Sequence, residues 1–348
     1  MEPVHESIFS STIRSFCKAF AGVIGIALAI VPLILFIGSF NSDYDSAPKI
    51  DVKFLPDLEG NTKVEAPSSP VVLQINIHGV IGEEEGTLAE EVDLILTESR
   101  KGIFSEDRVR AILLHINTPG GLVTDSDNIY RYLEAYKKKH SIPIYAYVNG
   151  LCASGGMYVG CAADKILTSP VSLVGSIGVR MGTYFNISQP LKMLKIMSKS
   201  FSEGKGKDEM NPVRPWKEGE GDYIQEIGQF YYKTFVDIVT KSRPNIAPTK
   251  LVEEYGAKLF DAPTAKRLGY VDESESSYHQ TLNELLVAAN IDPSSPYQIV
   301  ELSGKKPWVR KLFSSDAKSV QKFLRGIFVQ EDKLPFSYLH RESSPHFD

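Results

Sequence analysis

Apolar and polar residues alternate with a changing period along this chain, and the pattern predicts strands and helices in turn. Apolar runs of strand length lie at 71–77, 109–117 and 142–148, each close to Gly, Pro or Asn. Between them, at 88–100 and 124–138, apolar residues recur at every third or fourth position, as in a helix. Alternation of strand and helix is typical of βαβ units, so we predict an α/β fold with a mostly parallel sheet.

The pattern continues with less regularity beyond residue 180 and loses its alternation after about residue 275. We therefore predict one domain at 71–275 and a C-terminal extension at 276–348, partly helical with a mobile polar end. The further elements predicted are a strand at 195–202 and helices at 223–242, 251–255, 264–268, 282–289 and 317–327.

A charge-free apolar run precedes this domain, at residues 19–40. As a helix it spans about 33 Å, enough for the hydrocarbon core of a bilayer. A cleavable signal peptide is the alternative, but the run does not end in the small residues of a cleavage site. We predict a tail at 1–18, one transmembrane helix at 19–40 and a linker at 41–70.

The charges that flank the run indicate its orientation. Arg14 and Lys18 precede it, and the first charges beyond it are acidic, which predicts a cytoplasmic N-terminus and a domain outside the cytoplasm. Lys49 and Lys53 equal that basic count on the far side, so the flanks alone leave the orientation open.

Composition narrows the classes of partner and cofactor. An apolar content of 43% allows a large core, and a net charge of −5 gives no reason to expect a nucleic-acid partner. The three cysteines, Cys17, Cys152 and Cys161, lack the paired spacing of a disulfide framework or a zinc site. We expect no metal and no cofactor, and we expect Cys152 and Cys161 to be small buried residues.

Ser154 is the first candidate for chemistry, because it follows a strand-like run and opens a segment of small residues. Such a junction exposes the hydroxyl beside outward-pointing amides, which suits a nucleophile; the alternative is a helix N-cap. Cys152 is a less favoured nucleophile. The amides of Gly120, Gly121 and Gly155 could hold an oxyanion, although 119–121 also reads as a sharp break between strand and helix.

A serine nucleophile needs a base, and no histidine lies between Ser154 and His279. His115 lies inside a predicted strand and favours a core position, whereas His78 ends a strand and remains an alternative base. A lysine amine can replace histidine where burial favours its neutral form. Lys207, in a glycine-spaced loop, is one candidate among many lysines, and the alternative is an ordinary surface lysine.

Four motifs occur in a characteristic order: INTPGG at 116–121, NGLCASGG at 149–156, AADKI at 162–166 and GSIGV at 175–179. With these motifs, residues 71–275 resemble the bacterial signal peptide peptidase A family. Its members are membrane-anchored serine–lysine proteases. The resemblance implies a Clp-protease/crotonase-like fold, here in the short single-domain form.

The resemblance also implies roles for individual residues. Ser154 matches the nucleophile, and Lys207 matches the base, as the last residue of a Gly-x-x-Lys element. Ser176 matches the serine that orients the lysine amine. Lys205 remains an alternative base.

The second glycine of the Pro-Gly-Gly motif, Gly121, and the amide of Gly155 match the oxyanion hole of the family. In short members, the resemblance further implies a ring-like homo-oligomer whose serine and lysine come from adjacent subunits.

We therefore predict a single-pass serine endopeptidase of the bacterial inner membrane whose catalytic domain faces outside the cytoplasm. Its expected substrates are signal peptides or other short unfolded segments. Two alternatives are a catalytically inactive membrane scaffold of the same fold and a crotonase-like enzyme acting on acyl-coenzyme A.

Overall fold

The computed structural model describes residues 15–26, 28–30 and 50–304, in two units that divide after Lys49. In the first unit, residues 15–26 and 28–30 are helical. No helix in these described ranges is both long enough and apolar enough to cross a bilayer. Because the predicted anchor 19–40 runs on through residues outside the description, it stays a prediction. The helix predicted at 317–327 also lies outside the described residues.

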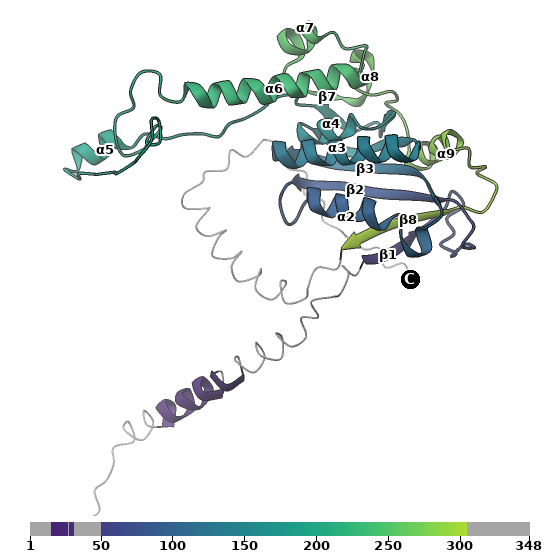
Figure 1. Cartoon of the computed structure of the whole chain (residues 1–348), viewed down its shortest axis with the longest axis horizontal. Coiled ribbons are helices and arrows are strands. Elements are labelled where there is room, and N and C mark those ends of the chain that lie inside the picture. Colours follow the sequence, from purple (N-terminus) through teal and green to yellow (C-terminus); the bar gives the residue numbers. More distant parts are fainter. Residues whose placement is uncertain (1–14, 27, 31–49, 305–348) are drawn as a thin grey trace, which may run out of the picture. The chain divides into compact units, whose positions relative to one another are not determined.

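The described part of the second unit is built on an eight-stranded sheet with the order β1-β8-β2-β3-β4-β6-β7, and β5 pairs with β4 (Figure 1). Neighbouring strands from β8 to β6 run parallel, whereas β1 and β7 pair antiparallel at the two edges. The predicted α/β fold with a mostly parallel sheet is confirmed. The strands are β1 Ile50–Leu55, β2 Val71–Ile81, β3 Val109–Gly121, β4 Ile144–Ala153, β5 Lys165–Thr168, β6 Leu173–Gly175, β7 Leu259–Asp261 and β8 Gln298–Gly304.

Helices cover both faces of this sheet, as a parallel sheet requires. On one face, Ile75 and Ile77 of β2 share a core cluster with residues of α2, α3, α4 and α6; on the other, Val72 shares a cluster with α9. The helices are α2 Ala89–Glu98, α3 Val123–His140, α4 Gly155–Gly160, α5 Ser188–Met193, α6 Asp222–Ser242, α7 Pro248–Lys250, α8 Ala262–Leu268 and α9 Tyr278–Ala288, with short turns η1 Gly102–Phe104 and η2 Leu251–Tyr255.

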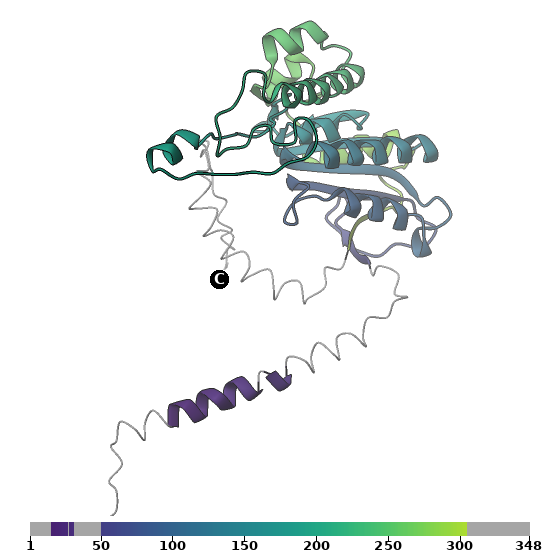
Figure 2. The ribbon, with the colours of Figure 1, turned by 60° about the vertical axis from the view of Figure 1, so that its left-hand side comes forward.

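The segment between β6 and α6 forms an arm that leaves the sheet, carries α5 near its tip and returns through α6 (Figures 1 and 2). The strand predicted at 195–202 is wrong, because these residues lie on this arm and form no regular element. On the arm they have no neighbouring strand to pair with. Their apolar side chains are exposed, with Met197 95% and Phe201 84% accessible.

The sheet extends beyond the predicted domain at both ends. β1 lies within the predicted linker 41–70, and β8 lies within the predicted extension 276–348. Half of the residues of β1 are exposed and none is buried, so the strand lacks the apolar run that marks a buried strand in the sequence. β8 pairs with β1 on one side and with β2 on the other, so it lies between these two strands in the sheet.

The motif at 119–121, which reads as a strand break in the sequence, belongs to a strand that continues through a β-bulge. Between the pairs His78–Asn117 and Val80–Gly120, β3 contributes two residues where β2 contributes one, so the ladder continues to Gly121. The break predicted at 119–121 is therefore wrong, because β3 runs on to Gly121. Pro119 is tolerated because a bulged residue needs no ladder donor. A second register shift lies between β3 and β4, where residues 149–151 of β4 stand opposite Asn117 alone.

Candidate active site

Ser154 occupies the junction between β4 and α4, as its sequence position predicts. Its backbone has φ 51° and ψ −118°, a conformation that is costly for a residue with a β carbon and that clusters at functional sites. The turn is held because the Ser154 amide donates to Gly175 O (2.9 Å) and its carbonyl accepts from Tyr158 N (3.0 Å). Ser154 occupies the N-cap position of α4, but its side chain makes no capping hydrogen bond, so capping does not account for the hydroxyl.

The two glycines predicted for the oxyanion hole lie in the same small cavity as Ser154. A β carbon built on Gly155 would stand 3.2 Å from the amide nitrogen of Gly121, which measures how closely the two backbones approach. The next amide, of Leu122, donates to Ile81 O (2.9 Å), and amides alternate in direction along a strand, so the Gly121 amide points away from β2. The structure thus brings Gly121 and Gly155 together beside Ser154, and their role as oxyanion donors stays a prediction.

Ser176 lies next to Ser154 across the sheet. β4 and β6 pair through Ala153 and Gly175, and each serine is the residue that follows this pair. Both serines have a positive φ, 51° and 56°, and the Ser176 amide donates to Lys258 O (2.7 Å). The structure therefore places two of the three predicted side chains at the same end of neighbouring strands.

Lys207 does not join them within one chain. It is exposed on the arm, in a turn closed by its amide and Gly204 O (3.2 Å). The cavity there is lined by Lys205, Lys207 and charged neighbours such as Arg214, and it shares no lining residue with the cavity at Ser154. Neither candidate lysine is thus beside the serine of its own chain.

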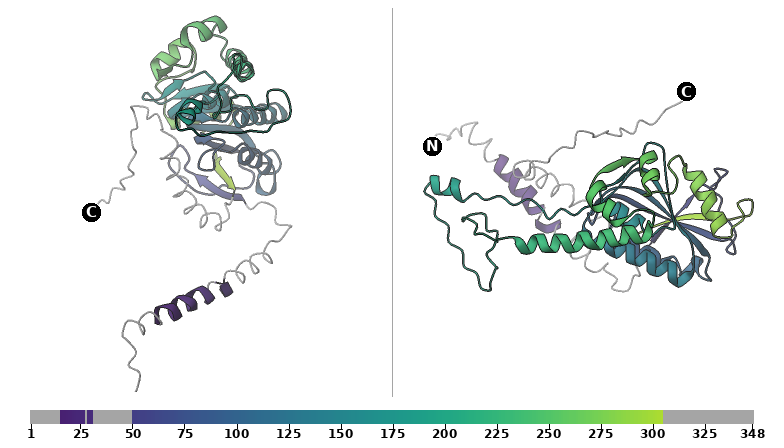
Figure 3. Two further views of the ribbon diagram at one scale, coloured as in Figure 1. Left: turned by 90° about the vertical axis from the view of Figure 1, so that its left-hand side faces the viewer. Right: turned by 90° about the horizontal axis from the view of Figure 1, so that it is seen from above.

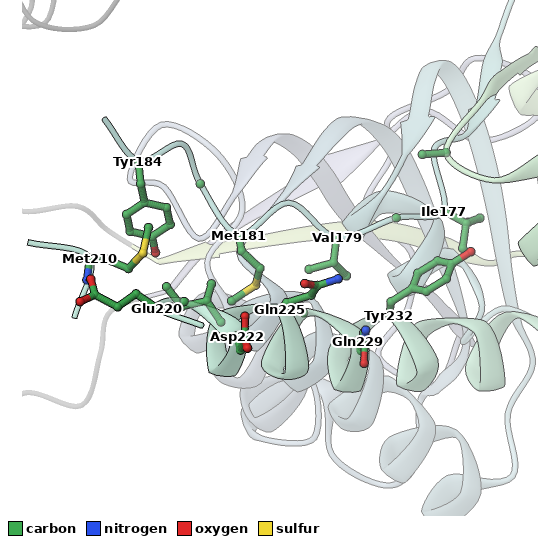
Figure 4. A pocket seen from close by; sticks show the side chains of 16 residues that line it. Ile177, Val179, Met181, Tyr184, Met210, Glu220, Asp222, Gln225, Gln229 and Tyr232 are labelled. Atoms are coloured by element: carbon green, nitrogen blue, oxygen red, sulfur yellow. The ribbon is translucent and has the colours of Figure 1, made fainter. Parts of the chain in front are cut away.

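A groove that sequence reasoning missed continues from the Ser154 cavity along the arm. The two share Gly178 and Val179 as lining residues, and the groove has a volume of about 680 Å³. Figure 4 shows the 177–184 segment and α6 facing each other across it, with Met181 and Tyr232 among the side chains that line it. Its walls come from segments far apart in the sequence, so no local pattern marks it.

Cys152 does not fit the role of nucleophile. Its side chain is completely buried, and burial raises the pKa of the thiol far above its usual range. Burial also raises the pKa of Cys161 to about 11. Both residues are small core side chains, as predicted. Within residues 15–26, 28–30 and 50–304, no group of three or more His, Cys, Asp or Glu side chains is placed to hold a metal ion.

His78 and His115 form a pair on the sheet face covered by α9, outside the Ser154 cavity. His78 Nε2 lies 3.2 Å from His115 Nδ1, and the His115 ring stacks on Tyr147 with centroids 5.8 Å apart. Burial, and to a smaller extent the charge of His78, lower the pKa of His115 to about 4, against a weaker opposing effect of Glu301. His78 does not line the cavity of Ser154, so it is not placed to act as the base for the serine of its own chain.

We expect this pair to make the fold acid-sensitive. Unfolded histidine binds a proton near pH 6.5, whereas folded His115 resists protonation until about pH 4, so the unfolded state binds more protons between these values. The contribution of neutral His115 to the free energy of unfolding is fully present above pH 6.5 and is lost as the pH falls toward 4. The expected loss is about 1–2 kcal/mol after allowance for partial solvent screening. Urea unfolding across this range would measure it. The variant His115→Phe, which keeps the stacked ring, should have a shallower slope; an unchanged slope would contradict the assignment.

Part of this chain is similar in sequence to known peptidases. Residues 136–292 match the model described as peptidase family S49. A protein of Methanocaldococcus jannaschii provisionally named as a protease is 35% identical over 198 residues, which are 56% of this chain and 60% of the relative. An Enterococcus faecium protein provisionally named signal peptide peptidase SppA is 31% identical over 222 residues, 62% of this chain and 63% of the relative.

A more distant relative is the chloroplastic serine protease SPPA of Arabidopsis thaliana. It is 24% identical over 287 residues, covering 77% of this chain and 42% of the relative. This chain thus spans about three fifths of the length of the first two relatives and less of the third.

Among solved structures, a ClpP1 variant from Listeria monocytogenes aligns with 60% of this chain and 94% of its own, at 16% identity and a TM-score of 0.38. A variant of the 1510-N membrane-bound stomatin-specific protease aligns with 69% of this chain and 100% of its own, at 18% identity and a TM-score of 0.40. These scores are too low to support an argument, so the Clp-protease/crotonase-like assignment stays a prediction.

Proposed function

Since residues 136–292 place this chain in peptidase family S49, we propose that it is a serine endopeptidase with Ser154 as its nucleophile. The observation that carries the proposal is the strained Ser154 turn, which shares one cavity with the backbones of Gly121 and Gly155. A helix cap needs neither the strain nor the two glycines, whereas acyl transfer needs an exposed hydroxyl and preorganised amide donors.

In the proposed mechanism, the neutral amine of Lys207 removes the proton of Ser154, and the serine oxygen attacks the scissile carbonyl. The amides of Gly121 and Gly155 stabilise the oxyanion of the tetrahedral intermediate. Lys207 then protonates the leaving amine, and water releases the acyl group by the reverse sequence. Ser176, adjacent to Ser154 in the sheet, orients the lysine amine.

Lys207 is proposed to reach the serine of a neighbouring copy in a homo-oligomer. The arm that carries Lys207 also exposes large apolar side chains, with Phe185 73%, Met193 83% and Met197 95% accessible. Several large apolar side chains exposed on one segment are typical of a surface that contacts another protein. A neighbouring copy would cover this surface and bury the lysine, and burial favours the neutral amine that a base requires.

The proposed substrates are signal peptides or other short unfolded segments after their release. The groove of Figure 4 supports this class, because it adjoins Ser154 and its walls include Met181, Ile224 and Tyr232. We further propose that the predicted helix at 19–40 anchors the chain in a bacterial inner membrane, with the catalytic domain outside the cytoplasm.

Incubation of the detergent-solubilised full chain with a panel of short peptides, graded from apolar to charged, tests this function. We expect apolar peptides to be cleaved at internal bonds and charged ones to be spared, because the groove walls offer few charges. Mass spectrometry of the products locates the cleavage sites. Absence of turnover on every peptide, together with no labelling by a serine-directed acylating probe, would favour the inactive scaffold.

A further inference from the structure

The bulge at Thr118 and Pro119, directly before Gly120, is bridged by the side chain of Thr118. Its hydroxyl donates to Gly79 O of β2 and accepts from the amide of Gly120 (3.0 Å). Thr118 is completely buried, so no solvent reaches this hydroxyl to replace it. At a bulge the strand ladder is interrupted, and here a hydroxyl supplies the partners that the ladder cannot.

The Thr118 methyl group makes a second contact, with the helix that begins after Ser154. A β carbon built on Gly156 would lie 2.5 Å from the Thr118 methyl carbon, so the two surfaces touch without space between them. One side chain therefore joins the end of β2, the loop of Gly120 and Gly121, and the first turn of α4.

We propose that Thr118 is a positioning residue that sets the oxyanion hole, an inference that rests on the proposed peptidase function. By binding the Gly120 amide, the hydroxyl turns that amide away from the site and leaves the Gly121 amide as the donor directed toward Gly155. Hydrogen bonds to an oxyanion are effective only at preorganised distances, so a shift of the loop slows acylation more than it weakens peptide binding.

Two substitutions separate the hydroxyl from the methyl group. Thr118→Val keeps the shape and removes both hydrogen bonds; Thr118→Ser keeps the bonds and removes the methyl group. We expect Thr118→Val to lower kcat by about 10- to 100-fold with KM changed less than about twofold, below the loss seen for complete removal of an oxyanion donor. Thr118→Ser should stay within about threefold of wild type in kcat.

Backbone amide hydrogen exchange gives a readout that does not depend on turnover. The Gly120 amide should exchange slowly in wild type and in Thr118→Ser, and at least about tenfold faster in Thr118→Val. If Thr118→Val does not fold, Thr118→Cys takes its place against Thr118→Ser, because a thiol is only a weak donor and acceptor. The cysteine variant should then show the lower kcat and the faster exchange.

Equal kcat values for the valine (or cysteine) and serine variants would overturn the proposal. It would also be overturned if Thr118→Val had a lower melting temperature than wild type but an unchanged kcat. A wild-type chain that neither cleaves peptides nor reacts with a serine-directed probe would instead refute the peptidase function itself. The two results can be told apart. In the first, the wild-type chain is active and only the expected effect of Thr118 is absent. In the second, the wild-type chain itself is inactive.

Discussion

Replacement of Ser154 by alanine is expected to lower peptide hydrolysis by about 10⁴-fold or more, and to abolish labelling by a serine-directed acylating probe. The reason is that the hydroxyl at the β4–α4 junction is the atom that forms the acyl bond, and no neighbouring group replaces it. The folded state should persist, since the Ser154 side chain makes no capping hydrogen bond. Kinetics on one peptide and gel-based labelling measure the two effects.

The matched control is Cys152→Ala, two residues earlier in the chain. This thiol is completely buried, so its removal should reduce stability through lost packing while leaving kcat near the wild-type value. If Ser154→Ala keeps peptidase activity, the proposed mechanism fails. If Cys152→Ala alone abolishes activity in a folded chain, the nucleophile is the thiol.

Lys207→Ala is expected to lower kcat by about 10²- to 10⁴-fold, the usual contribution of a general base. The control is Lys205→Ala, two residues away in the same exposed loop, which should change kcat little. Initial rates at saturating peptide measure both variants. The opposite result, with loss only in Lys205→Ala, would transfer the role of base to Lys205.

Lys207→Ala, combined with Ser154→Ala, also tests whether one active site is formed by two copies of the chain. Ser154→Ala and Lys207→Ala are each inactive alone, but co-expressed chains should recover about a quarter of wild-type activity, because random mixing completes about one site in four in a closed ring. A site built from one chain would recover nothing. Size-exclusion chromatography confirms that the mixed chains assemble.

The sequence predicted the central part of the fold well. Strands 71–77 and 109–117 and helix 124–138 appear as β2, β3 and α3, because their apolar residues repeat with a clear period and face a core on defined sides. β1 and β8 escaped prediction for a physical reason. β1 is an edge strand with no buried residue and no continuous apolar run, and its backbone pairs with that of β8.

The candidate site was only partly predictable. Ser154 and Ser176 were located by motif, and the structure explains their proximity by strand register, which no single motif contains. The glycine motif at 119–121 was misread as a break, because a bulge and a turn use the same residue types. The separation of Lys207 from Ser154 within one chain depends on the arm, whose apolar residues are exposed and follow no local pattern that would have revealed its course.

The pairing of Ile50 with Gly304 has a consequence for how the chain is made. β8 is the last described strand to leave the ribosome, yet it belongs between β1 and β2, which are made first. Until Gln298–Gly304 emerges, both early strands carry open hydrogen-bonding edges that other chains could occupy. Nascent chains that stall before residue 298 are therefore the species most exposed to misassembly, and completion of the sheet is a late event in synthesis.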